Sequence, residues 1–153
     1  MDTAPKHIIA VSANVTNEKG ETLLVKTHCR SDTWETPGGQ VEEGEPLDKA
    51  VSREILEETG IVISPIGITG LYYNATKYLL SVVFKAKYVK GDIKIQPEEI
   101  KEAKFIKLTE ENINSYITRP HMKSRTLDCM NPSNFIPYET WEVSPYNLVG
   151  RLF

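Results

Sequence analysis

The sequence has few of the features that mark a secreted, membrane-bound or disordered chain. Its two cysteines, Cys29 and Cys129, do not make a disulfide framework. No apolar run approaches the roughly 18 residues that a membrane helix needs, and residues 1–6 lack the apolar stretch of a signal peptide. With 40% hydrophobic and 25% charged residues, the composition is that of an ordinary globular chain. We therefore expect a single cytoplasmic domain over residues 1–153, with reduced thiols.

The chain also lacks a strong overall charge, because its formal net charge is −3. No general basic field is present to recruit nucleic acid, so neither a nucleic acid nor a membrane is expected as a partner. The negative charge is concentrated between Gly39 and Ile61, where seven acidic residues accompany two basic ones. Such a block is either a solvated helix face or a cation site, and the placement of the acids decides between them.

Hydrophobic periodicity predicts several strands around one early helix, with further helices near the C-terminus. The predicted strands are residues 7–15, 22–25, 61–68, 71–73, 78–89 and 103–108. The predicted helices are residues 46–60, opened by Pro46 and closed by Gly60, then 109–117 and 120–130. This order of elements is typical of an α+β domain with a mixed sheet.

The C-terminal segment from Asn131 to Phe153 is rich in aromatic residues, which are Phe135, Tyr138, Trp141, Tyr146 and Phe153. A segment of that composition is unsuited to a solvated linker. We expect residues 131–153 to pack as an extension on the domain or on a second subunit, which leaves a homodimer open.

The acidic residues of the predicted helix do not lie opposite its apolar stripe. On a helical wheel, Glu54, Glu57 and Glu58 fall in the same arc as the apolar residues that should face the core. Carboxylates at i, i+3 and i+4 have Cβ atoms about 5–6 Å apart, and partial desolvation makes each repulsion of order several kcal/mol. Arg53 neutralises part of this cluster, and a divalent metal ion is the common solution for converging oxygen ligands.

A glycine-containing break comes just before the acidic helix. Pro37, Gly38 and Gly39 follow Trp34 and interrupt any regular element. Glycines let backbone carbonyls or amides approach a ligand closely. An ordinary tight turn is the alternative, but the nearby acidic helix favours a functional loop.

Nine spaced positions between Gly39 and Ile61 resemble the Nudix box. They are Gly39, Glu45, Arg53, Glu54, Ile55, Glu57, Glu58, Gly60 and Ile61. The preceding Trp34-x-x-Pro37-Gly38-Gly39 is similar to the usual entry to that box. The sequence thus resembles the Nudix hydrolase (MutT-like) family, and the resemblance implies an α/β/α sandwich with a central mixed β-sheet.

The resemblance implies a role for each matching residue. It assigns Mg²⁺ or Mn²⁺ binding to three helix carboxylates and a loop carbonyl, namely Glu54, Glu57, Glu58 and Gly38. It gives supporting roles to Gly39, Glu45 and Arg53, in which Arg53 orients the helix carboxylates and Glu45 anchors the loop to Arg53. The implied reaction is metal-assisted hydrolysis of a diphosphate.

Many Nudix proteins use a further carboxylate from a later loop. The candidates are Glu98, Glu99 and Glu102, and we favour Glu99 because it lies just before the strand that contains Phe105. The resemblance then makes either Glu54 or Glu99 the catalytic base.

The box implies a substrate in which a nucleoside diphosphate is linked to another group. Thr76 stands where ADP-ribose enzymes often have proline, which argues against that subgroup. Tyr78 stands near the tyrosine of dinucleoside polyphosphate hydrolases, although its place at the start of an apolar strand favours core packing. Arg30 lies in the loop where family members often contact the base or phosphate.

We therefore expect a pyrophosphohydrolase acting on a nucleoside triphosphate or a nucleotide sugar. The alternatives are a dinucleoside polyphosphate hydrolase and a non-catalytic, nucleotide-sensing module. Such modules usually lose carboxylates of the box, whereas this chain keeps all of them. A Nudix-fold isomerase would need a further catalytic cysteine and glutamate whose contexts are not evident.

Overall fold

The centre of the molecule is a mixed β-sheet. The structure, a computed structural model, describes residues 3–132 and 134–152. The sheet strands are β1 (Ile8–Thr16), β2 (Thr22–Thr27), β3 (Gly38–Gln40), β4 (Val62–Asn74), β5 (Leu79–Lys90) and β6 (Ile100–Ile106). Their order is β4-β5-β1-β2-β6, with β3 paired to β1. Strands β1 and β5 are parallel and the other pairs antiparallel, which confirms the predicted α+β class with a mixed sheet.

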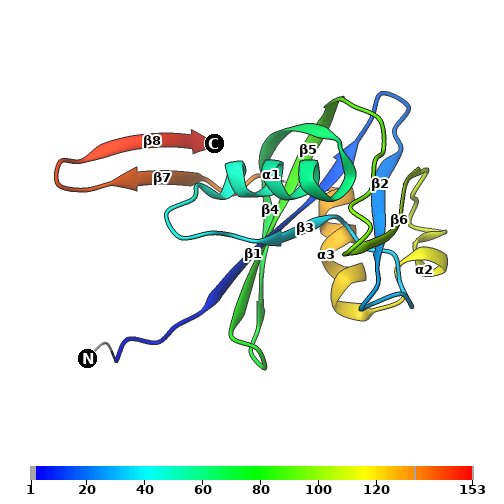
Figure 1. The fold of residues 1–153 in the computed structure, drawn as a ribbon, viewed down its shortest axis with the longest axis horizontal. Helices are drawn as coiled ribbons and strands as arrows, with labels where there is room; N and C mark the ends of the chain where they lie inside the picture. Colours follow the sequence, from blue (N-terminus) through cyan, green and yellow to red (C-terminus); the bar gives the residue numbers. More distant parts are fainter. Residues whose placement is uncertain (1–2, 133, 153) are drawn as a thin grey trace.

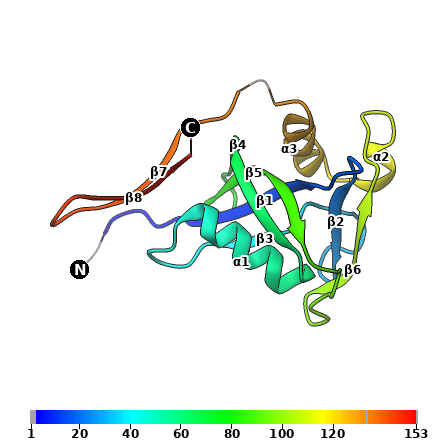
Figure 2. The same cartoon turned by 90° about the horizontal axis from the view of Figure 1, so that it is seen from above.

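Helices cover both faces of this sheet, as Figures 1 and 2 show. Helix α1 (Leu47–Thr59) lies on one face, and α3 (Pro120–Met130) lies on the other, preceded by the short α2 (Ile113–Tyr116). One core fills the space beneath α1 and includes Ile55 and Phe84. A second core includes Trp34, Ile117 and Met122. None of the described helices is long and apolar enough to cross a membrane.

Strand β3 fills a gap between β1 and β2. These two strands pair next to their connecting turn, and further along, the chain segment 35–40 lies between them. Glu35 bridges to Val25 of β2, while Gly38 to Gln40 pair with β1. A Cβ atom on Gly38 would lie 2.0 Å from the carbonyl oxygen of Val11, so this close pairing requires glycine.

The ends of α1 are formed by the residue types that the sequence analysis singled out. The helix begins at Leu47, one residue after Pro46, and Gly60 ends it in the left-handed conformation with φ of 75°. Pro46 provides no side-chain cap. Instead, the hydroxyl of Tyr138, far along the chain, accepts a hydrogen bond from the backbone N–H of Leu47 at 2.8 Å. This bond satisfies one of the free amides at the helix start.

Several elements differ in length from the prediction. The pieces 61–68 and 71–73 form one strand, β4, whose pairing with β5 shifts register near Pro65 and Ile68. These irregularities interrupt the alternation that the sequence pattern relies on. The predicted helix 109–117 is reduced to α2, and Thr109 accepts a hydrogen bond from the N–H of Asn112 just before it.

The C-terminal segment contains a second, two-stranded sheet that periodicity did not predict. Strands β7 (Tyr138–Glu142) and β8 (Asn147–Leu152) form a hairpin that projects beyond α1, drawn in orange and red in Figure 1. Tyr138 and Leu152 pack against the core beneath α1. Trp141 and Tyr146 are exposed. Phe153, together with residues 1–2 and 133, lies outside the described residues.

Candidate active site

A cavity of about 540 Å³ lies between α1, β3 and the loop of residues 91–99. Its acidic lining residues are Glu54, Glu58, Glu98 and Glu99, and we call it the acidic cavity. Gly38 and Gly39 form part of its wall. A Cβ atom on Gly39 would lie 2.4 Å from the carboxylate of Glu54, so the strand leaves room for that side chain only if it carries glycine.

Glu58 is the most buried of these acids. It is 5% exposed, and one carboxylate oxygen accepts a hydrogen bond from the N–H of Gly38 at 3.0 Å. Burial raises the pKa of Glu58 to about 8, and the charges of Glu54 and Glu99 add to this shift. Burial also raises the pKa of Glu54, although its contact with Arg53 opposes that change. A nearby positive charge would therefore stabilise the ionised forms of these carboxyl groups.

Arg53 connects the carboxylates of α1 to the preceding loop. Its Nε and Nη2 atoms donate to both oxygens of Glu45 at 2.7 and 2.9 Å, which lowers the pKa of Glu45. Its Nη1 atom donates to Glu54 at 3.0 Å and contacts Glu57 at 3.4 Å. The side chain of Glu57 is 50% exposed and lies outside the cavity lining. Of the three box carboxylates, the structure therefore brings Glu54 and Glu58 into the cavity and leaves Glu57 at its edge.

The loop of residues 91–99 is fastened to the last turn of α1. Two backbone hydrogen bonds make this link, from Lys94 N–H to the carbonyl of Thr59 and from Gln96 N–H to the carbonyl of Glu58. As a result, Glu98 and Glu99 both line the acidic cavity. Glu102 lies on β6 and makes a 3.9 Å ion pair with Lys26 instead.

The donors of the acidic cavity are of the kind that Mg²⁺ and Mn²⁺ prefer, because they are carboxylate and carbonyl oxygens. Within residues 3–132 and 134–152, no three acidic, histidine or cysteine side chains are already arranged as a metal-binding group. Arg53 and the N–H of Gly38 occupy oxygens of Glu54 and Glu58. The donor chemistry therefore fits a hard cation, and Arg53 contacts one of the two oxygens of Glu54.

A second cavity, of about 720 Å³, lies on the other side of β3. Its basic lining residues are Arg30, Lys77, Arg119, His121 and Arg125, and we call it the basic cavity. Among the described residues, Glu35 is the one acidic side chain in its lining. The two cavities share Arg30, Gly38 and Gly39. A ligand that extends past β3 would thus contact opposite charges at its two ends.

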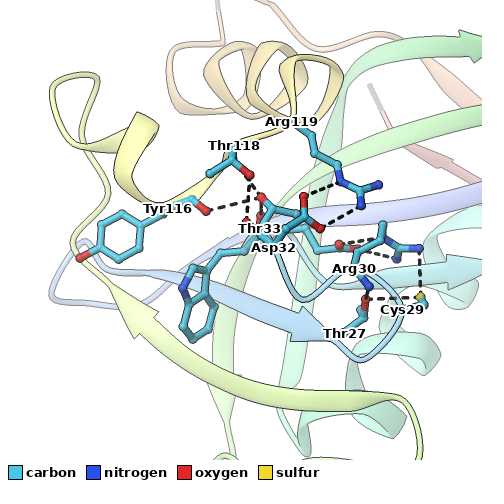
Figure 3. A network of polar contacts seen from close by, with 10 residues as sticks. Thr27, Cys29, Arg30, Asp32, Thr33, Tyr116, Thr118 and Arg119 are labelled. Carbon is cyan, nitrogen blue, oxygen red and sulfur yellow. Dashed lines mark hydrogen bonds and ion pairs between the residues drawn. The ribbon is translucent and has the colours of Figure 1, made fainter.

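Two arginines of the basic cavity are held by carboxylates, as Figure 3 shows for the loop of residues 28–33. Arg30 donates to both oxygens of the buried Glu35 at 2.9 and 2.8 Å. Arg119 donates to both oxygens of Asp32 at 3.2 and 2.9 Å. These paired contacts fix the loop before Trp34 and leave Arg30 at the boundary of both cavities.

Tyr78 is not where the sequence placed it. It lies in the turn before β5 with φ of 55°, and 61% of its surface is exposed. The predicted core packing is wrong, because the strand starts one residue later and Tyr78 points away from the core toward His7. It is absent from the lining of both cavities among the described residues.

Sequence reasoning missed the residues that α3 and the loops bring to the basic cavity. Arg119 and Arg125 match no motif and are distant from the box, and Glu35 occupies an unspecified position of the Trp34-x-x-Pro37-Gly38-Gly39 segment. For Arg125 a weak signal exists, because it lies next to Thr126 and three residues after Met122, both buried on the inner face of α3. A basic residue at the margin of a buried stripe marks a polar site or a cavity wall.

Comparison with known proteins identifies relatives over much of the chain. A "MutT-like protein" of Streptomyces ambofaciens is 37% identical over 83 residues, which cover 54% of this chain and 53% of that protein. An "NAD-capped RNA hydrolase NudC" of Mannheimia succiniciproducens is 33% identical over 110 residues, which cover 67% of this chain and 41% of that protein. The chain spans about half the length, or less, of these curated relatives.

Solved structures share the fold. The MutT protein of Methanosarcina mazei Go1 is 33% identical, with a TM-score of 0.67 over 84% of this chain and 96% of that one. A Nudix hydrolase of Nitrosomonas europaea is 27% identical, with a TM-score of 0.66 over 80% and 88% of the two chains. The NUDIX domain family matches residues 6–124, which hold α1, β3 and the residues that line both cavities apart from Arg125. The chain belongs to the NUDIX domain family.

Proposed function

We propose that this chain is a hydrolase that uses Mg²⁺ or Mn²⁺ to cleave a phosphoric anhydride bond in a nucleotide-type substrate. The observation that carries the proposal is the acidic cavity, in which the buried Glu58 lies beside Glu54 and Glu99 against a strand of glycines. Family membership and the names of the relatives, MutT-like protein and NAD-capped RNA hydrolase, support the same chemistry.

The cation would be held by the oxygens of the acidic cavity and its edge. We assign it the carboxylates of Glu54, Glu57 and Glu58 and the carbonyl of Gly38, with Glu99 as a further donor. When bound, the cation supplies positive charge and Lewis acidity to the anhydride oxygens. The repulsion among Glu54, Glu58 and Glu99, which contributes to the raised pKa of Glu58, supports this assignment.

The protein side chains would orient the reactants and move a proton. Glu54 and Glu99 both line the cavity, and either would accept a proton from the attacking water. The raised pKa of Glu54 brings that group closer to the range in which a carboxylate is an effective base. Arg53 holds Glu54, and the Gly38 N–H holds Glu58, so both carboxylates are oriented before a substrate arrives. The products would be a nucleoside monophosphate and either pyrophosphate or a phosphorylated remainder.

The substrate classes that we favour are nucleoside triphosphates and nucleotide sugars, with dinucleotides and dinucleoside polyphosphates next. The basic cavity adjoins the acidic one across β3 and provides space for the group attached to the anhydride. The NudC relatives, named as NAD-capped RNA hydrolases, add NAD-type dinucleotides to the classes worth testing.

The test is a phosphate-release screen. Purified protein with Mg²⁺ or Mn²⁺ is given nucleoside triphosphates, nucleotide sugars, NADH and dinucleoside polyphosphates, with pyrophosphatase or phosphatase added to release phosphate from the products. We expect release that disappears in excess chelator and in Glu58→Gln. Glu111→Gln, which changes an exposed carboxylate outside both cavities, is the matched control. Turnover in metal-free protein, or none with any substrate, would contradict the proposal.

A further inference from the structure

Arg125 is the arginine of the basic cavity that has no carboxylate partner among the described residues. It lies on the inner margin of α3, and its Nη1 atom donates to the hydroxyl of Ser81 at 3.2 Å. No carboxylate in the described part of the chain lies within ion-pairing distance of it. Arg30 and Arg119 lie in the same cavity, and each donates two hydrogen bonds to a carboxylate. Most of the donors of the Arg125 guanidinium are therefore available to a ligand.

Among the described residues of the basic cavity, the arginine and lysine charges without a carboxylate partner are those of Arg125 and Lys77. Arg119 and His121 line the same cavity, and Lys77 lies on its wall from the turn between β4 and β5. Burial lowers the pKa of Arg125, and burial together with Arg125 and Arg119 lowers the pKa of His121. Glu35, the acidic lining residue, already accepts both bonds from Arg30. The wall around Arg125 thus has an excess of positive charge.

The position of this wall relative to the acidic cavity indicates what would reach it. Gly38 and Gly39 border both cavities, so a substrate whose anhydride lies at Glu54 and Glu58 extends past β3 toward α3. A neutral base or sugar would leave the Arg125 charge uncompensated. A phosphate group would accept charge-assisted bonds from the planar guanidinium, which matches phosphate oxygens in pairs.

We propose that Arg125 binds a phosphate group of the substrate other than those of the hydrolysed anhydride, so that the preferred substrate carries an additional phosphate. The proposal rests on the proposed hydrolase function and specifies its substrate class. The additional phosphate has two possible sources, which are a longer phosphate chain and a phosphate ester on a ribose.

Binding without metal tests the basic cavity separately from hydrolysis. In excess chelator, the acidic cavity repels phosphate, so isothermal titration reports on the basic cavity. The probes are AMP, ADP, which adds a phosphate to the chain, and adenosine 2′,5′-bisphosphate, which adds one to the ribose. We expect one of the two larger probes to bind at least about tenfold more tightly than AMP, the scale of a hydrogen bond to a charged group. Equal affinity for all three probes would overturn the proposal. The probe that binds more tightly than AMP identifies whether the additional phosphate belongs to the phosphate chain or to the ribose.

Variants of α3 connect that gain to Arg125. In Arg125→Met we expect the advantage of the larger probe over AMP to fall to within about threefold, with an unchanged or higher melting temperature, because a partly buried charge without a carboxylate partner is removed. Arg125→Lys should keep part of the higher affinity for the larger probe, because lysine keeps the positive charge but lacks the planar guanidinium that contacts two phosphate oxygens. Lys123→Met removes a charge from the same helix outside the cavity lining and should behave as wild type.

The outcomes separate this proposal from the proposed function. If Arg125→Met still binds the larger probe at least about tenfold more tightly than AMP, whatever its melting temperature, the role of Arg125 is overturned. Should Arg125→Met fail to fold, a full wild-type gain in Arg125→Lys would overturn the bidentate contact. Hydrolysis without the phosphate gain contradicts this inference alone, whereas the gain without hydrolysis of any substrate contradicts the proposed function alone.

Discussion

The acidic and basic cavities lie on either side of the short strand β3, and their charged side chains differ in how they are paired. In the acidic cavity, Glu54 and Glu58 are held by Arg53 and by a backbone N–H, yet burial still raises the pKa values of both acids. In the basic cavity, Arg30 and Arg119 are paired with carboxylates, whereas Arg125 has no carboxylate partner in the part of the chain that the structure describes. Each cavity thus retains an excess of one sign. The difference teaches that the site is complementary to a cation at one end and to an anion at the other.

The largest effect should come from neutralising the acids of α1. In Glu58→Gln and Glu57→Gln the shape is kept and a negative charge is lost. We expect turnover to fall by about a hundredfold or more, the scale of losing a group that stabilises transition-state charge. Steady-state kinetics at saturating Mg²⁺ measures this loss, with circular dichroism to verify folding. Wild-type turnover in both variants would place the metal chemistry outside this helix.

The second effect concerns the loop that closes the acidic cavity. Glu99→Gln should lower the catalytic rate by about tenfold to a thousandfold, in line with general-base contributions, with a smaller change in substrate binding. Glu98→Gln and Glu102→Gln should stay within a few-fold of wild type. Glu102 is the sharper control, because it pairs with Lys26 outside the cavity. If Glu98 proves to be the sensitive position, the register within the loop is wrong and the loop's role stands.

The third prediction concerns the pH dependence of the metal-free protein. Burial raises the pKa of Glu58 in the folded state to about 8, above its ordinary value of 4.5, so between these pH values the folded state binds the extra proton. The free energy of unfolding should therefore fall as pH rises from about 5 to 8, by at most about 1.4 kcal/mol per pH unit from this group.

Urea unfolding in chelator at several pH values measures that slope. Glu58→Gln should flatten it, because the titrating group is removed. A Mg²⁺ concentration that saturates the site should also flatten it, since bound cation favours the ionised carboxylate. An identical slope in wild type and Glu58→Gln would show that another group causes the pH dependence.

The fourth prediction compares two arginine–carboxylate pairs of the basic cavity. Glu35→Gln leaves the partly buried Arg30 without its ionised partner, and we expect a loss of about 1–3 kcal/mol in the free energy of unfolding. Asp32→Asn breaks the exposed pair with Arg119 and should change stability little, because solvent screens that pair. Urea unfolding of both variants is the measurement, and equal losses would remove the distinction between buried and exposed pairs.

The smallest effect is expected at the start of α1. Tyr138→Phe removes the hydroxyl that accepts the N–H of Leu47, and the cost should be about 1 kcal/mol, as for the loss of a helix cap. Tyr146→Phe alters an exposed tyrosine of the same hairpin and serves as the control. A thermal-unfolding difference of zero between the two variants would show that the bond does not stabilise the helix.

The local sequence pattern predicted much of the acidic cavity. The spacing of residues 46–60 predicted a helix, and the burial of Glu58 follows from its place among the apolar residues of that helix. A helical wheel of residues 46–60 places Thr59 on the outer face, away from the apolar stripe, whereas Thr59 is fully buried. Its burial depends on the loop of residues 91–99, whose Lys94 binds the Thr59 carbonyl. A wheel describes one helix and carries no information about a distant loop that docks on it.

Most residues of the basic cavity could not be predicted from the sequence. Arg30 was singled out from its place before Trp34, but its partner Glu35 becomes apparent only when the chain segment 35–40 is inserted between β1 and β2. Arg125 reaches the same cavity from a helix almost a hundred residues later. The hairpin of β7 and β8 escaped prediction because most of its side chains are exposed and give no clean alternation.

The insertion of β3 between β1 and β2 has a consequence for how such a protein can diversify. The carboxylates come from α1 and the loop of residues 91–99, whereas Arg125 and the residues near it come from α3 and the turn after β4. Gly38 and Gly39 of β3 border both cavities, and a Cβ atom on either residue would clash with neighbouring atoms. Under the proposed function, mutations on α3 would alter which substrate is bound without disturbing the residues assigned to hydrolysis, and laboratory selection for new ligands should accumulate changes there first.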